Sequence, residues 1–136
     1  MYHGGVMALV RTKELDVNAR LRELDLSRPI LLDVLRKCVG AYGDCTDNDP
    51  PSAKGYEPYR IGTRQLREVV LPGREDWEKD DTANLSSIKN DKLRIKVVVL
   101  NTTDKTGNPD PKAVPRNRVE KGILHERAIR SVDCNP

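Results

Sequence analysis

The chain has 136 residues, a length typical of one domain with a single core. Charged residues make up 33% of it and aromatic residues only 4%, with no phenylalanine, so leucine, valine and isoleucine must fill the core. The net charge of +3 is too small by itself to indicate a nucleic-acid-binding protein. We therefore expect a single domain over residues 1–136, in which homo-oligomerisation is one way to bury the apolar area that aromatic side chains would otherwise supply.

The cysteines and the N-terminal residues bear on the cellular compartment. Cys38, Cys45 and Cys134 show no C-x-x-C spacing, and neither His3 nor His125 lies near them in the sequence. This usage argues against a zinc site and favours free thiols in a reducing compartment. The first ten residues hold no apolar run long enough for a signal or membrane segment. The sequence predicts a cytoplasmic protein with no metal and no membrane partner.

The first elements predicted along the chain are a strand and two helices. The apolar run at 6–10 is interpreted as an edge or first strand, and Asp16 as the cap of a first helix with apolar residues at helical spacing. The second helix is marked more clearly, because Ser27 is a good N-cap and the apolar residues that follow fall on one stripe. Gly40 and Gly43 are expected to end this helix.

The middle of the chain is predicted to be irregular. Residues 43–59 hold three prolines and two glycines, which predicts a flexible loop of a length that is either functional or disordered. Thr63 is a candidate cap for a short helix, with a strand at 69–71 as the competing interpretation. Beyond the charged stretch around Trp77, apolar spacing indicates one more short helix from about Thr82.

Residues 93–100 form the clearest predicted strand. Alternate apolar residues point to one face, while Arg94 and Lys96 begin the other. A strand needs partners, and the candidates are 6–10 and 69–71. The sequence thus predicts an α+β fold with a small antiparallel or mixed sheet packed with several short amphipathic helices.

The C-terminal part of the chain carries the strongest functional signal. Residues 101–116 are predicted to form a loop, and Asn117 with Glu120 resembles a capping box that opens a helix. From Lys112 to Arg130 there are six basic and two acidic side chains. Free backbone N–H groups at a helix start favour anions, and arginine binds phosphate through two parallel hydrogen bonds. The predicted ligand-binding residues are Arg116, Arg118, Lys121, Arg127 and Arg130, extended by Arg94 and Lys96 on the strand.

Other roles for these residues stay open. The basic segment is equally well read as a solvated helix face, or as a partner of the acidic stretch at 74–81, which has two basic and five acidic side chains. Stacking on a base requires an aromatic ring, and Tyr56, Tyr59 and Trp77 are the candidates, all in predicted loops. The alternative role for these three side chains is to anchor the loops on the core.

Motifs for catalysis and calcium binding fail on their spacing. Residues 104–107, Asp-Lys-Thr-Gly, resemble the phosphorylation loop of P-type ATPases, but the match covers four residues and Asn108 departs from the pattern, so a turn is favoured. Starting from Asp44 or Asp47, an EF-hand loop lacks glycine at its sixth position and glutamate at its twelfth. His125 and the glutamate after it project in different directions on a helix. No nucleotide-binding or hydrolase motif is present.

These observations predict a small non-enzymatic protein without a cofactor. We expect it to hold an anionic ligand, such as a nucleotide, an oligonucleotide or nucleic acid, through the basic C-terminal segment. Small proteins of mixed charge without catalytic motifs often serve as accessory factors of phages and mobile elements. The alternative is a protein–protein interaction module or inhibitor that docks through the charged stretch around Trp77 or through the 43–59 loop.

Overall fold

The computed structural model describes residues 11–101, 110 and 112. The helices are α1 (Glu14–Glu23), α2 (Arg28–Asp44) and α3 (Ala53–Val70), and the strands are β1 (Glu78–Asp80), β2 (Ser87–Asn90) and β3 (Ile95–Val97), with a 3₁₀ turn η1 (Thr82–Asn84) between the first two strands. The sheet is antiparallel in the order β1-β2-β3. The predicted α+β class with a small sheet is confirmed.

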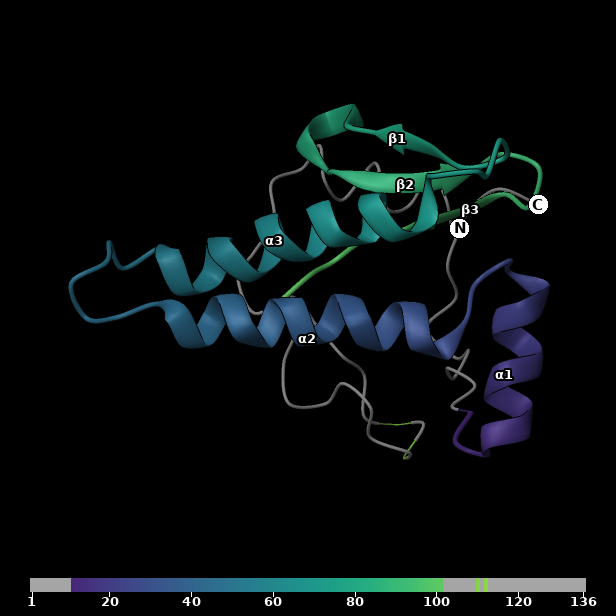
Figure 1. Ribbon diagram of the computed structural model, residues 1–136, viewed down its shortest axis with the longest axis horizontal. Coiled ribbons are helices and arrows are strands. Elements are labelled where there is room, and N and C mark those ends of the chain that lie inside the picture. The colour runs from purple at the N-terminus through teal and green to yellow at the C-terminus, as the bar shows by residue number, and fades with distance from the viewer. Residues whose placement is uncertain (1–10, 102–109, 111, 113–136) are drawn as a thin grey trace.

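The described elements form three layers (Figure 1). Helices α2 and α3 lie side by side, and the sheet covers the side of α3 that faces away from α2. Helix α1 stands across one end of α2. Because α3 is the central layer, it meets both neighbours. The buried cluster at these contacts consists of Leu26, Val34, Leu66, Val70, Trp77 and Ile88.

Helix α2 begins as the sequence predicts and ends later. The Ser27 hydroxyl oxygen accepts a hydrogen bond from the Ile30 backbone N–H at 3.5 Å. The predicted end is wrong, because the helix runs through Gly40 and Gly43 to Asp44. A glycine inside a helix costs only about 1 kcal/mol, which packing of α2 along α3 offsets.

The loop predicted over 43–59 is mostly helical, because α2 and α3 extend into it from both sides. The irregular connection covers only 45–52. It is closed by the Asp49 carboxylate, which accepts a hydrogen bond from the Thr46 N–H at 2.7 Å. Pro58 lies inside α3 and is buried, so the residue that indicated a loop is part of a helix face. Proline is tolerated there at the cost of one backbone hydrogen bond.

Two other predicted elements are corrected. The alternative strand at 69–71 is wrong, since Val69 and Val70 belong to α3. The helix expected from Thr82 is a single 3₁₀ turn, because Ala83 has a φ of 57°, in the left-handed region that stops a right-handed helix. The chain beyond it forms β2, whose Ile88 is completely buried.

The strand expected over 93–100 is shorter than predicted. Strand β3 begins only after Arg94, whose φ of 57° forms a turn that no continuous strand contains. The partner of β3 is β2, with Ile88 opposite Val97, and β1 pairs with the other edge of β2. The predicted strand at 6–10 and the helix from Asn117 lie outside the described residues.

Helices α2 and α3 are in tight contact at Gly62. A Cβ atom there would overlap the Cys38 sulfur and come within 3.0 Å of the Val99 side chain. Glycine is therefore required at this position for the two helices to pack. None of the helices among residues 11–101 is long and apolar enough to cross a membrane.

Candidate anion-binding groove

The structure describes some of the predicted binding residues and not others. Arg116, Arg118, Lys121, Arg127 and Arg130 lie outside the described residues, and their role stays a prediction. Arg94 occupies the turn before β3. Lys96 on β3 is bound to the Asp80 carboxylate at 2.7 Å. The charge of Lys96 is thus used inside the fold, and this residue does not extend a ligand surface.

The three aromatic candidates are also separated by the structure. Trp77 is only 4% exposed, and its indole N–H donates to the Asp25 carboxylate at 2.9 Å. Its ring therefore anchors the chain on the core and offers no face for stacking or docking. Tyr56 and Tyr59 project from α3, not from a loop, with ring centroids 6.1 Å apart. Tyr56 is 55% exposed and remains a stacking candidate.

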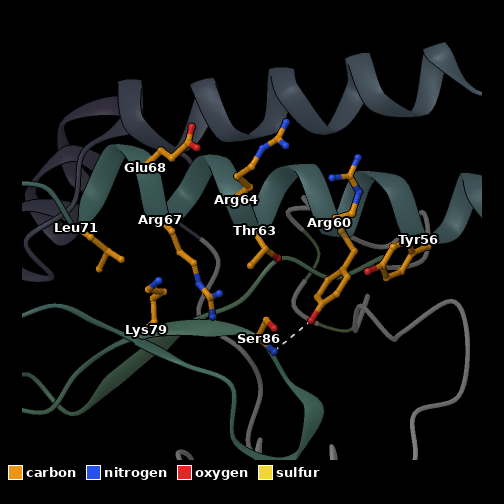
Figure 2. Close-up of a pocket in the computed structure, with 10 residues that line it drawn as sticks. Tyr56, Arg60, Thr63, Arg64, Arg67, Glu68, Leu71, Lys79 and Ser86 are labelled. Atoms are coloured by element: carbon orange, nitrogen blue, oxygen red, sulfur yellow. Dashed lines mark hydrogen bonds between the residues drawn. The ribbon is translucent and has the colours of Figure 1, made fainter.

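A groove with basic walls runs between α3 and the sheet. Arg60, Arg64 and Arg67 recur at spacings of four and three residues, so they share one side of α3. Lys79 lies on β1 across from α3, and the hollow between these elements has a volume of about 490 Å³ (Figure 2). Arg67 extends towards the strands, whereas the guanidinium groups of Arg60 and Arg64 point away from them. We call this hollow the basic groove. Its further lining residues are Tyr56, Tyr59, Thr63, Glu68, Leu71 and Ser86.

Arg67 forms the fixed part of the groove. One guanidinium nitrogen donates to the Asp81 carboxylate at 2.7 Å and to the Ser87 carbonyl oxygen at 3.0 Å. The Arg67 hydrogen bond, followed by that of the Ser86 hydroxyl, lowers the pKa of Asp81. Figure 2 shows Arg67 extending from α3 towards the strands. Its charge is largely satisfied, and it ties the helix to the sheet.

The cationic side chains at the rim of the groove differ in whether they form an ion pair. Arg60 is paired with Glu57 of the same helix at 2.8 Å. Arg64 and Lys79 are exposed, and neither forms an ion pair with any residue in the described part of the chain. The acidic side chain that lines the groove is Glu68, one helical turn from Arg64. Arg64 and Lys79 are therefore the charges available to a ligand.

Two hydrogen-bond donors in the groove wall lack a partner. The Thr63 hydroxyl and the Arg67 Nε are buried without a hydrogen bond to the described residues, and Thr63 as a whole is 7% exposed. An unsatisfied buried donor costs about 1–3 kcal/mol. Figure 2 shows Thr63 on the side of α3 that faces the strands, between Arg67 and Arg60 along the helix. Neither atom has exposed surface, so an anionic oxygen of a ligand reaches these donors only when the side chains that cover them move aside.

A second hollow, of about 430 Å³, lies between the end of α2 and the start of α3. Asp44, Asp49 and Glu57 line it together with Cys45. Burial first, and then the neighbouring carboxylates, raise the pKa of the Cys45 thiol, which keeps it protonated and a weak nucleophile. Within residues 11–101 no group of three or more histidine, cysteine and acidic side chains is arranged to hold a metal ion.

Comparison with known proteins adds no assignment. No protein-family model matches this chain, and no curated protein or solved structure is significantly similar to it.

Sequence reasoning missed the basic groove because it divided 53–70 between a loop and a short helix. The signal was present, since Arg60, Arg64 and Arg67 have the spacing of one helix face. Recognising it required α3 to continue through Pro58. Lys79 had no signal of its own, because its position opposite α3 depends on the pairing of β1 with β2.

Proposed function

We propose that this protein is a non-enzymatic binding protein for a phosphate-bearing ligand, a nucleotide or an oligonucleotide, with the basic groove as its site. The observation that carries the proposal is the pair Arg64 and Lys79. They come from different elements, line one groove, and have no ion-pair partner among the described residues. Each of these exposed cations attracts an anion, and an extended ligand along the groove can contact both.

The groove supplies more than charge. A guanidinium binds phosphate through two parallel hydrogen bonds, and an ammonium acts as a point charge beside it. The half-exposed ring of Tyr56 offers a surface for a base, and such stacking contributes about 1–3 kcal/mol per base. The basic residues from Arg116 onward stay predicted contacts to the same ligand. The wider assignment to accessory factors of phages or mobile elements also stays a prediction.

The proposal is tested by the binding of a fluorescent single-stranded oligonucleotide and of ADP, followed by anisotropy and calorimetry at several salt concentrations. We expect Arg64→Ala and Lys79→Ala each to weaken oligonucleotide binding at low salt. Each variant should also reduce the slope of log K against log salt by about 0.7, the value for one lost phosphate contact on a single strand. Arg22→Ala is the matched control, since Arg22 is exposed on α1 and does not line the groove.

Absence of binding to both probes at low salt contradicts the proposal. Equal losses in Arg64→Ala and Arg22→Ala contradict it as well, because they indicate attraction to the net charge of the protein and not to this groove.

Thr63 offers a second test in which stability and binding change in opposite directions. Thr63→Val replaces a buried hydroxyl that has no partner among the described residues with a methyl group of similar size. We expect the free energy of unfolding without ligand to stay equal or to rise by up to about 1 kcal/mol. Oligonucleotide affinity should fall, whereas Thr63→Ser should retain it. Unchanged affinity in Thr63→Val would show that the hydroxyl does not contact the ligand. The cations alone would then carry the binding.

A further inference from the structure

Three side chains of the basic groove form a row along α3. Tyr56, Arg60 and Arg64 follow one another at intervals of four residues, so they share one face of the helix (Figure 2). Neighbours in this row are about 6 Å apart along the helix axis, the rise of four residues. The row offers one aromatic ring and two guanidinium groups in sequence. A single strand binds such an arrangement when its backbone follows the cations and a base stacks on the ring.

Acidic side chains lie at both ends of the row. Glu68 is the next residue at the same interval after Arg64, and it lines the same groove. Beyond Tyr56 lies the second hollow, where Asp44 is one of the acidic wall residues. Carboxylates repel phosphate, so within the row only Arg60 and Arg64 can hold it. The row can therefore hold a short stretch of phosphate backbone.

Glu57 neutralises the charge of Arg60 in the free protein. The Nε and Nη2 atoms of Arg60 donate to the same carboxylate oxygen, at 3.0 and 2.8 Å. The side chains of Arg60 and Glu57 are 44% and 34% exposed, and ion pairs in such contact with water are weak. A phosphate binds a guanidinium through two charge-assisted hydrogen bonds to separate oxygen atoms. Phosphate can therefore displace Glu57 from Arg60 at small cost.

The position of Arg60 suits this exchange. Arg60 lines both hollows, whereas Glu57 lines only the second. Figure 2 shows the guanidinium of Arg60 turned away from the strands. Rotation about the bonds of this exposed side chain changes its direction without any change in the backbone. Arg60 can thus pair with Glu57 in the free protein and with a phosphate when a ligand is bound.

We propose that Arg60 is a further phosphate contact of the basic groove, that Glu57 holds it back in the free protein, and that the ligand is a single-stranded oligonucleotide lying along α3. Phosphates of one strand bind Arg64 and Arg60, and a base stacks on Tyr56. This inference rests on the proposed function and narrows its ligand from nucleotides in general to a single strand. Glu57 favours ligands that make enough contacts elsewhere in the groove to displace it.

The first test compares Glu57→Gln with the wild type by oligonucleotide anisotropy at low salt. We expect Glu57→Gln to bind about two- to fivefold more tightly, because Arg60 no longer has to leave a charged carboxylate. Glu23→Gln is the matched control, since Glu23 pairs with Arg20 on α1 at the same sequence spacing and the same 2.8 Å. Both substitutions change the net charge equally. Equal gains in the two variants overturn the proposal.

Arg60→Ala separates the release of this arginine from the field of the Glu57 carboxylate. We expect Arg60→Ala to weaken oligonucleotide binding by about threefold or more, and Glu57→Gln to give no gain when Arg60 is absent. Glutamine and alanine are good helix formers, so neither substitution disfavours α3. A gain that persists without Arg60 overturns the proposal, and so does unchanged binding in Arg60→Ala.

The length of the strand supplies the last test. Affinity should rise from ADP to short oligothymidylates and level off once the row is filled. ADP that binds as tightly as the longer strands overturns the assignment to a single strand. If Arg64→Ala weakens binding while the Glu57 and Arg60 variants change nothing, the proposed function stands and this inference falls. If neither probe binds the wild type at low salt, both fall.

Discussion

Helices α2 and α3 have 17 and 18 residues and pack along each other, yet they are buried to different degrees. Five residues of α3 are buried, against Val34 alone in α2. The difference follows from the layer order, because α3 lies between α2 and the sheet while α2 is an outer layer. The fold therefore depends on α3 for its core, whereas Leu35, Val39 and Tyr42 of α2 are exposed among the described residues.

The largest expected contrast between the two helices comes from leucine truncation. Leu66 on α3 is 1% exposed, so Leu66→Ala removes buried area and leaves a cavity, at a cost of about 2–5 kcal/mol in the free energy of unfolding. Leu35→Ala on α2 should cost less than about 1 kcal/mol when the chain is monomeric, because that side chain is mostly in water. Urea unfolding of both variants measures the two values. Similar losses would mean that the two helices do not differ as described.

The ion pair between Asp80 on β1 and Lys96 on β3 is expected to make the next largest contribution to stability. Asp80 is bound to Lys96 at 2.7 Å, with Thr82 as a further donor, and these contacts hold the pKa of Asp80 well below its usual range. Asp80→Asn leaves Lys96 without its partner, and because the Lys96 side chain is 23% exposed we expect a loss smaller than the ~3–5 kcal/mol of a fully buried pair. Chemical denaturation at pH 7 measures the change. A loss no larger than that of an exposed pair, such as Arg20 with Glu23, would contradict the structural role.

The same pair predicts how stability depends on pH. Because the pKa of Asp80 is lower in the folded than in the unfolded chain, its contribution is complete above about pH 5 and is lost as the pH falls through about 4 and below. The wild type should therefore lose stability in acid more steeply than Asp80→Asn. Parallel pH profiles for the two proteins would show that another carboxylate dominates acid unfolding.

The smallest and most specific contrast uses two glycines. Gly62→Ala on α3 places a methyl group against the Cys38 sulfur and the Val99 side chain, and we expect it to cost about 1–3 kcal/mol. Gly40→Ala on α2 meets open space and should stabilise the helix by up to about 1 kcal/mol. Thermal unfolding of the two variants gives shifts of opposite sign if α3 is the enclosed helix. Shifts of the same sign would contradict the described packing at Gly62.

The sequence predicted those parts of the fold that local signals specify. Ser27 defined the start of α2, and the mixture of helical and alternating patterns indicated an α+β protein with a small sheet. The predictions failed where tertiary packing overrides local preference. Gly40 and Pro58 both indicated irregular structure, and both lie inside helices. Strands β1 and β2 were missed because each is shorter than five residues and lacks a regular alternation.

The sequence predicted the residue types of the candidate site but not its location. A phosphate-binding group of arginine and lysine was expected from Arg116 onward, which lies outside the described residues. The described cluster of Arg60, Arg64, Arg67 and Lys79 instead depends on a helix face and on a strand pairing. Of the aromatic candidates, Tyr56 and Tyr59 line this groove and Trp77 does not. The sequence indicated which residue types would form the site. Only the fold shows that these residues come together in one groove.

The position of Trp77 makes its intrinsic fluorescence a probe of the folded core. It is the only tryptophan in the chain, and its indole is held by Asp25 at the turn between α1 and α2. Arg74 also donates to the Asp25 backbone oxygen, at 2.6 Å, so the same turn is fixed by two side chains from beyond α3. Intrinsic fluorescence should therefore shift to longer wavelength when this junction opens. Because Trp77 does not line the basic groove, ligand titrations can be followed by an added dye while tryptophan emission independently reports that the core is intact.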